Sequence, residues 1–219
     1  MGYKILRDFS KKSAFECVSI GLIGTIGSGK TTVREIFSKY GVKSIDADYI
    51  SRKLYVKNSI TYEKIVRKFG TKILNFQGDI DRKVLGEIVF SDKEKLALLE
   101  EVTHKDINNF AENFLSSIPN GKVGLYESTK LIETGIYKKL DIIICVQSEI
   151  EKQLSRLAHS RNMSEKEVYE RISNQKSDTE NAKIANIVLE NNEDLQLLEK
   201  NVIEILQIIK KTLLKADKL

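Results

Sequence analysis

The run Gly24-Thr25-Ile26-Gly27-Ser28-Gly29-Lys30-Thr31 limits the possible folds of this chain more than any other feature. It matches the pattern G-x-x-x-x-G-K-[ST] in full. An apolar stretch at residues 17–24 leads into it and predicts a buried strand, and an amphipathic stretch at residues 30–40 predicts a helix after it. A strand, a glycine-rich turn and a helix in this order indicate a parallel α/β fold.

The composition of this turn suits a phosphate group, and we call residues 24–31 the phosphate loop. Glycine has no Cβ, so its backbone can let successive amides curl around phosphate oxygens. Lys30 can reach the β and γ phosphates of a nucleotide, and the Thr31 hydroxyl is placed to ligate Mg²⁺. The alternative is a turn of this composition without a ligand. We predict that ATP binds with Mg²⁺, and we assign its site to Gly24, Gly27, Ser28, Gly29, Lys30, Thr31 and Thr32.

The rest of the chain repeats the pattern of strand and helix. Further strands are predicted at residues 42–46, 122–127, 141–146 and 187–190, and further helices at residues 61–69, 92–117 and 194–215. The fold class predicted is α/β, with a P-loop NTPase-type parallel β-sheet flanked by helices. With one proline in 219 residues there is no obvious linker, so we predict a single domain over residues 1–219. We divide it into a core at residues 17–50, 120–147 and 185–219, an inserted helical substrate-binding lobe at residues 51–119, and a helical lid at residues 148–184.

Helix starts are marked by serines that precede a glutamate by three positions. In such a capping box the two side chains satisfy backbone amides of the first helical turn. The pairs are Ser91 with Glu94, Ser148 with Glu151, Ser164 with Glu167, and Ser177 with Glu180. We expect a helix to begin after each of these serines.

The second predicted strand ends in Asp46-Ala47-Asp48, so both aspartates lie at the carboxyl edge of the sheet, where open α/β folds bind ligands. One carboxylate could accept a proton from an attacking hydroxyl, and the other could orient a water bound to Mg²⁺. The alternative is that Asp48 only caps a helix beginning near Tyr49.

The formal net charge of +5 is compatible with nucleic acid, a membrane surface or a phosphorylated small molecule as a partner. Lys and Arg alternate with Asp and Glu, as in Lys93-Glu94-Lys95, which is typical of solvated helix faces. No stretch approaches the roughly 18 apolar residues of a membrane span. Two cysteines, Cys17 and Cys145, are too few for a disulfide framework. We therefore expect a cytoplasmic protein with reduced thiols and no membrane anchor.

Several motifs together resemble one family. The segment from Gly21 to Val33 and the later Ile45-Asp46-Ala47-Asp48 resemble the opening of dephospho-coenzyme A kinases. Residues 81–90, which read D-R-K-V-L-G-E-I-V-F, resemble that family's D-R-x-x-L-x-x-I-V-F segment. Residues 98–104, 131–135 and 153–156 and the pair Glu190-Asn191 continue the resemblance in the family's order.

The resemblance implies transfer of the γ-phosphoryl group of ATP to the ribose 3′-hydroxyl of dephospho-coenzyme A, the final step of coenzyme A biosynthesis. The residues that match catalytic positions are Asp48 as general base, with Lys30 and the lid residue Arg161 offsetting charge on the phosphoryl group. The residues that match other positions are Asp46, Arg82 and His104 for the acceptor, Asn191 for ATP and Glu127 for Mg²⁺. Arg82 in an ordinary helix ion pair and His104 as a half-buried helical histidine are the alternative interpretations.

The sequence departs from the family's pattern at several positions. Lys105 stands where the family has proline after the histidine, Thr129 and Lys130 begin a segment that reads P-L-L-F-E in the family, and Glu127 replaces an aspartate. Residues 1–16 precede the family's usual start, and we expect a mobile basic arm. Another P-loop kinase of a small molecule, nucleoside or nucleotide is the alternative enzyme, and a nucleic-acid-binding ATPase is a more distant one. We expect no nucleic acid, membrane or obligate protein partner.

Overall fold

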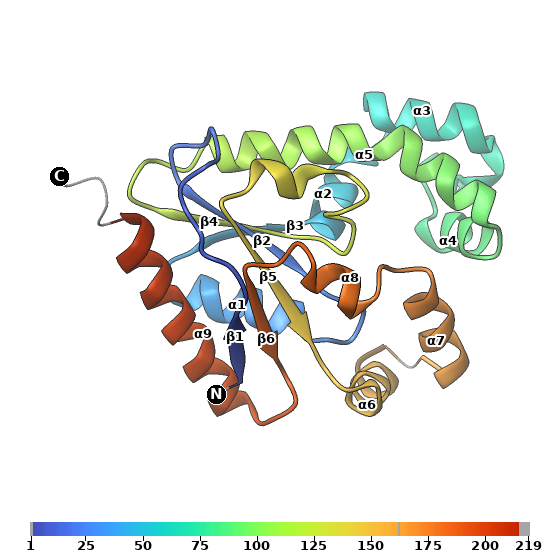
Figure 1. Ribbon diagram of the computed structural model, residues 1–219. Helices are drawn as coiled ribbons and strands as arrows, with labels where there is room; N and C mark the ends of the chain where they lie inside the picture. The colour runs from blue at the N-terminus through green and yellow to red at the C-terminus, as the bar shows by residue number, and fades with distance from the viewer. Residues whose placement is uncertain (1, 162, 215–219) are drawn as a thin grey trace. The chain divides into compact units, whose positions relative to one another are not determined.

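The computed structural model describes residues 2–161 and 163–214, without the side chains of Phe90 and Arg161 (Figure 1). The chain forms two compact units. The first comprises Met1–Ile45 and Phe114–Leu219, and the second comprises Asp46–Asn113. No helix among the described residues has both the length and the apolar character needed to cross a membrane.

A six-stranded sheet organises the first unit. Its strands are β1 (Tyr3–Ile5), β2 (Val18–Ile23), β3 (Lys43–Asp46), β4 (Val123–Glu127), β5 (Ile142–Gln147) and β6 (Ile187–Glu190), in the spatial order β1-β6-β5-β2-β4-β3. β2 pairs in parallel with both β4 and β5, and β5 pairs in parallel with β6. β1 alone is described as antiparallel, against β6. The predicted α/β class with a mostly parallel sheet is confirmed, and the five predicted strands lie within a residue of their expected bounds.

Helices cover this sheet because its strands are apolar on both faces. Alternate residues of β2, including Ile20 and Leu22, join an apolar core with side chains of the helices that Figure 1 shows beside the sheet, α1 and α9. Each such isoleucine or leucine stabilises the fold by about 1.5–3 kcal/mol when buried. The helical segments of this unit are α1 (Lys30–Lys39), a 3₁₀ turn (Ile136–Lys139), α6 (Ile150–Arg161), α7 (Glu165–Ser173), α8 (Asp178–Ala182), α9 (Leu195–Ile209) and a π-helical turn (Lys210–Leu214).

The second unit is helical and has an apolar core of its own. Its elements are α2 (Ala47–Leu54), α3 (Ile60–Phe69), a 3₁₀ turn (Thr71–Ile73), α4 (Arg82–Phe90) and the greater part of α5 (Lys93–Ser116). Ile65 and Ile73 are fully buried in this core. A single bridge between Leu74 and Ile80 closes the loop that precedes α4.

Two of the four predicted capping boxes are confirmed, and two are wrong. Ser164 and Ser177 cap α7 and α8 with the reciprocal glutamate bonds. At the start of α5 the cap is Asp92, whose carboxylate accepts from the amides of Glu94 and Lys95. Ser91 instead donates to a carbonyl of the preceding helix. A carboxylate one residue nearer to the helix accepts these amide bonds more strongly than a hydroxyl does.

Ser148 does not cap α6 either. Its hydroxyl donates to the carbonyl of Asn191, at 2.9 Å, and the amide of Glu149 donates to the side chain of Asn192, at 2.8 Å. The partner is supplied by the loop after β6, some forty residues along the chain. Local spacing therefore could not reveal which residue satisfies this helix start.

The prediction that residues 1–16 form a mobile arm is wrong, because the structure binds this segment to the sheet. Tyr3–Ile5 pairs with β6, which hides the edge of that strand. The buried carboxylate of Asp141 accepts bonds from the amides of Lys12 and Ser13, both at 2.7 Å, and from the amide and hydroxyl of Ser19. Burial alone would raise the pKa of Asp141, but these hydrogen bonds outweigh it and lower the pKa below 3.8.

The Asp141 network predicts a pH-dependent contribution to stability. Because hydrogen bonds lower the folded-state pKa of Asp141, its stabilisation is complete above the ordinary value of 3.8 and is lost as the pH falls through the folded value. Asp141→Asn should lower the free energy of unfolding by roughly 1–3 kcal/mol at pH 7, since the NH2 group that replaces one carboxylate oxygen cannot accept the hydrogen bonds of the buried donors around that oxygen. The difference from the parent should shrink below the ordinary pKa.

Urea denaturation at pH 7 and at acid pH measures both quantities. Asp8→Asn is the matched control, because Asp8 is an exposed acid of the same segment. Equal unfolding free energies for the parent and Asp141→Asn at pH 7 would contradict the prediction.

Candidate functional site

The phosphate loop connects β2 to α1 and has a backbone that excludes larger residues. Gly29 has φ +95°, and a Cβ there would lie 2.1 Å from the side-chain nitrogen of Asn191. A Cβ on Gly24 would lie 2.2 Å from the carbonyl oxygen of Val146. Both positions therefore require glycine for space as well as for dihedral angle.

Three polar side chains of the loop are buried, those of Thr25, Ser28 and Lys30. Lys30 is 7% exposed, and its Nζ donates to the carbonyl of Thr25 at 2.9 Å. Ser28 is fully buried, and its hydroxyl is among the few buried polar atoms of the described residues that have no hydrogen-bond partner. A buried hydroxyl without a partner is costly, and a ligand oxygen at the loop would satisfy it. This observation fits the binding of a phosphate group.

Glu127, at the end of β4, lies next to the start of α1. Its carboxylate accepts from the Thr31 hydroxyl at 3.3 Å and from Nε of Arg34 at 2.8 Å. Hydroxyl and carboxylate oxygens are the ligands that Mg²⁺ prefers, and Mg²⁺ commonly takes its other ligands from phosphates and water. No cluster of three or more His, Cys, Asp or Glu suited to a metal occurs among residues 2–161 and 163–214. The donor set fits a cation that arrives with a nucleotide better than a resident metal.

Side chains from residues 148–184, the predicted lid, bind the phosphate loop. Oε1 of Gln175 accepts from the amide of Ile26 at 2.8 Å, and Nη1 of Arg156 donates to the carbonyl of Gly27 at 3.3 Å. The Thr25 hydroxyl lies 3.4 Å from Oε1 of Gln153 and from Oδ1 of Asp178. Burial raises the pKa of Asp178, against the opposing effects of Thr25 and Lys30.

The sequence did not single out Gln153, Gln175 and Asp178 as residues of this site. Glutamines carry no motif of their own, and these residues lie more than a hundred positions from the loop that they contact. Asn191 was predicted, and its Nδ2 donates to the carbonyl of Ser28 at 2.8 Å. The structure therefore brings Asn191 to the loop, together with Thr31 and Glu127 of the predicted metal site.

The predicted acceptor residues and general base belong to the second unit. Asp46 caps α2 by accepting from the amide of Tyr49 at 2.7 Å, so the suggestion that Asp48 is the cap is wrong. Asp48 lies in the first turn of α2 and is exposed. The guanidinium of Arg82 lies over the ring of Tyr55, 5.4 Å from its centre. Tyr55 was not predicted as part of the site.

The other two predicted residues, His104 and Arg161, belong to α5 and α6. His104 is partly buried on α5. Arg161 is the last residue of α6, but its side chain lies outside the described part of the chain.

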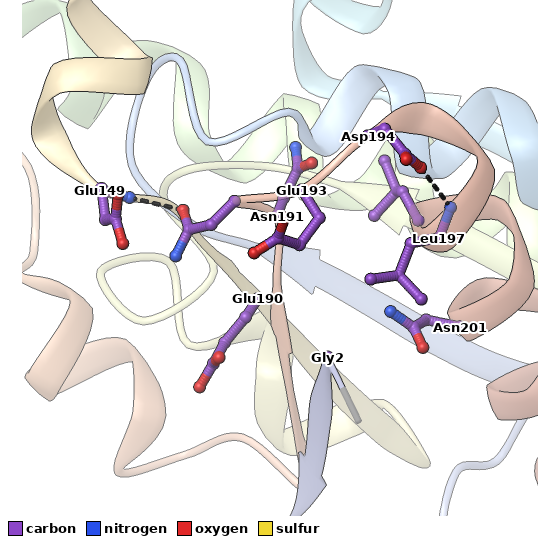
Figure 2. A pocket seen from close by; sticks show the side chains of 10 residues that line it. Gly2, Glu149, Glu190, Asn191, Glu193, Asp194, Leu197 and Asn201 are labelled. Atoms are coloured by element: carbon purple, nitrogen blue, oxygen red, sulfur yellow. Dashed lines mark hydrogen bonds between the residues drawn. The ribbon is translucent and has the colours of Figure 1, made fainter.

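A pocket of about 390 Å³ lies next to this site, between the end of β6 and the start of α9 (Figure 2). Figure 2 shows Glu149, Glu190, Glu193 and Asp194 around it, and Asp194 binds the amide of Leu197. So many carboxylates would repel a polyphosphate. The phosphates are therefore expected at the loop and not in this acidic pocket, although Asn191 lines it as well.

The loop geometry predicts that Gly29→Ala abolishes nucleotide binding. The added methyl group would meet the Asn191 side chain and displace it from the carbonyl of Ser28. Gly41→Ala is the matched control, because Gly41 has a similar φ of +85° but nothing within 4 Å of an added Cβ. Titration with a fluorescent ATP analogue measures the effect. Binding by Gly29→Ala as tight as by Gly41→Ala would refute the steric argument.

Comparison with known proteins places this geometry in one family. Residues 18–196 match the family model described as dephospho-CoA kinase. The dephospho-CoA kinase of Corynebacterium glutamicum is 37% identical over 191 residues, which is 85% of this chain and 98% of that protein. The dephospho-CoA kinase of Fusobacterium nucleatum subsp. nucleatum is 40% identical over 84% of this chain and 94% of its own length. The solved structure of the dephospho-CoA kinase from Campylobacter jejuni aligns with a TM-score of 0.65 and 30% identity, over 88% of this chain and 97% of that chain.

Proposed function

Because this chain belongs to the dephospho-CoA kinase family, we propose that it transfers the γ-phosphoryl group of ATP to the ribose 3′-hydroxyl of dephospho-coenzyme A, yielding coenzyme A and ADP. The observation that carries the proposal is the family match over residues 18–196, which contains an intact phosphate loop with a buried, unpartnered Ser28 hydroxyl. The proposal includes a cytoplasmic location, and no nucleic acid, membrane or obligate protein partner.

The nucleotide side of the reaction rests on the first unit. Backbone amides of the phosphate loop and the dipole at the start of α1 bind the phosphates of ATP. Lys30 has three N–H donors, so it keeps one on the carbonyl of Thr25 and directs the others to the β and γ phosphates, with Ser28 and Thr32 beside it. Thr31 and Glu127 would hold Mg²⁺, which supplies positive charge beside the polyphosphate when it is bound.

The acceptor side rests on the second unit. Asp48 takes the proton of the 3′-hydroxyl as the new bond from oxygen to phosphorus forms and the bond from the γ phosphorus to the bridging oxygen breaks, so that ADP leaves. Capping by Asp46 supports this role, because it releases Asp48 from the helix start. Arg82, His104 and Asp46 bind the acceptor, and Arg161 of the lid offsets charge on the transferred group.

The reaction is tested by incubating the protein with Mg-ATP and dephospho-coenzyme A and weighing the product by mass spectrometry. We expect dephospho-coenzyme A to gain one phosphate and ATP to become ADP. Shikimate, gluconate and nucleosides serve as alternative acceptors in parallel reactions. Phosphorylation of one of these, with dephospho-coenzyme A unchanged, would assign the chain to another P-loop kinase activity.

The role of Asp48 predicts that Asp48→Asn lowers kcat by about 10²- to 10⁴-fold, the usual contribution of a general base, and leaves ATP binding unchanged. Coupled measurement of ADP release gives kcat, and titration with a fluorescent ATP analogue gives binding. Asp92→Asn is the control, since it alters a carboxylate of the same unit that caps α5 and pairs with Lys95. A kcat within a few-fold of the parent would remove Asp48 from the mechanism.

A further inference from the structure

The peptide between Thr25 and Ile26 is held on both of its edges. Its N–H, from Ile26, donates to Oε1 of Gln175 at 2.8 Å. Its carbonyl, from Thr25, accepts from Nζ of Lys30 at 2.9 Å. A trans peptide is planar and points its N–H and C=O in opposite directions. This one planar peptide therefore links Gln175 of the lid, at its N–H, to Lys30 of the phosphate loop, at its carbonyl.

Gln175 extends from a segment that is itself fixed. It lies between the end of α7 at Ser173 and the start of α8 at Asp178. Nε2 of Gln147, the last residue of β5, donates to the carbonyl of Asp178 at 3.1 Å. The capping box at Ser177 fixes the turn in between. The side-chain carbonyl of Gln175 is thus placed by the sheet and by a helix start, and not by a freely moving loop.

The residues around this peptide also contact the lid. The Thr25 hydroxyl lies 3.4 Å from side-chain oxygens of Gln153 and Asp178. The Ile26 side chain packs with Leu157 of α6 and Val168 of α7 in a small apolar cluster. The lid therefore contacts the side chains of both Thr25 and Ile26. If Gln175 released the peptide between them and the peptide rotated, several of these contacts would break together.

We propose that Gln175 is a positioning residue for Lys30. By holding the Ile26 amide, and together with the Ser28 amide that also donates to the Thr25 carbonyl at 3.3 Å, it fixes the direction of that carbonyl and so the position of the lysine that contacts it. A loop that already has its bound shape loses less conformational freedom on binding, which increases affinity. The proposal rests on the proposed function only in taking ATP as the ligand, because the identity of the acceptor does not enter it.

The test is a double-mutant cycle on nucleotide binding, with Gln175→Met and Lys30→Met. Methionine keeps the length of the glutamine side chain and removes the hydrogen-bond acceptor. One lost hydrogen bond predicts that Gln175→Met weakens binding of a fluorescent ATP analogue about three- to tenfold. In the Lys30→Met background the same change should weaken binding by less than about twofold, because Gln175 acts through the lysine. In steady-state kinetics the KM for ATP should rise more than kcat falls.

Asn174→Ala is the matched control, since Asn174 is the exposed neighbour of Gln175 at the end of α7. Thermal melting shows whether each variant folds, and Gln175→Ala replaces Gln175→Met if the methionine variant does not fold. Unchanged or tighter binding in the single variant would overturn the proposal, as would an equal loss of affinity in both backgrounds. A protein that shows the expected cycle but does not phosphorylate dephospho-coenzyme A would refute the proposed reaction and leave the role of Gln175 standing.

Discussion

The conformation of the phosphate loop depends on hydrogen bonds to side chains outside it. Wherever this backbone turns an amide toward a ligand, the carbonyl of the same peptide points the opposite way. A carbonyl that is shielded from water and has no partner costs about 1–3 kcal/mol. Arg156 and Asn191 supply the partners for Gly27 and Ser28, the first from α6 and the second from the end of β6. Glycines permit the turn, but these side chains hold it in place.

The end of β6, which leads into Asn191, is itself held by the N-terminal segment. Asp141, directly before β5, binds residues 11–13, and the preceding residues place β1 along β6. The amide of Glu190 donates to the carbonyl of Gly2 at 2.8 Å, and the next residue is Asn191. The N-terminal segment, which precedes the region that matches the family model, therefore holds β6 in place. The residue that follows β6 is Asn191, which contacts the phosphate loop. The basic N-terminal stretch contains no motif, but it has a structural role. It provides hydrogen-bond donors for the buried carboxylate of Asp141 and pairs with the open edge of β6.

Much of the local structure followed from spacing and residue type. The apolar runs predicted the strands, and Ser164 and Ser177 capped their helices as expected. Predictions failed where a competing partner was present. Asp92, and not Ser91, caps α5 because a carboxylate is the stronger acceptor. At the start of α6 the side chain of Asn192, from a distant loop, accepts the hydrogen bond of the Glu149 amide. The first of these competitors was visible in the sequence, whereas the second was not.

The sequence by itself determined the phosphate loop, the parallel sheet and the family, because these depend on glycine dihedral angles, on the alternation of apolar runs and on motifs whose residues are close together. It also singled out Asn191 and Glu127 through resemblance. Only the tertiary structure decided that Asp46 and not Asp48 caps α2, that Gln175 holds the Ile26 amide, and that Asp141 binds the N-terminal segment. The cap depends on the residue at which β3 ends and α2 begins. The other two depend on which polar groups meet after the chain is folded, and a hydrogen bond between residues far apart in sequence leaves no periodic pattern by which to find it.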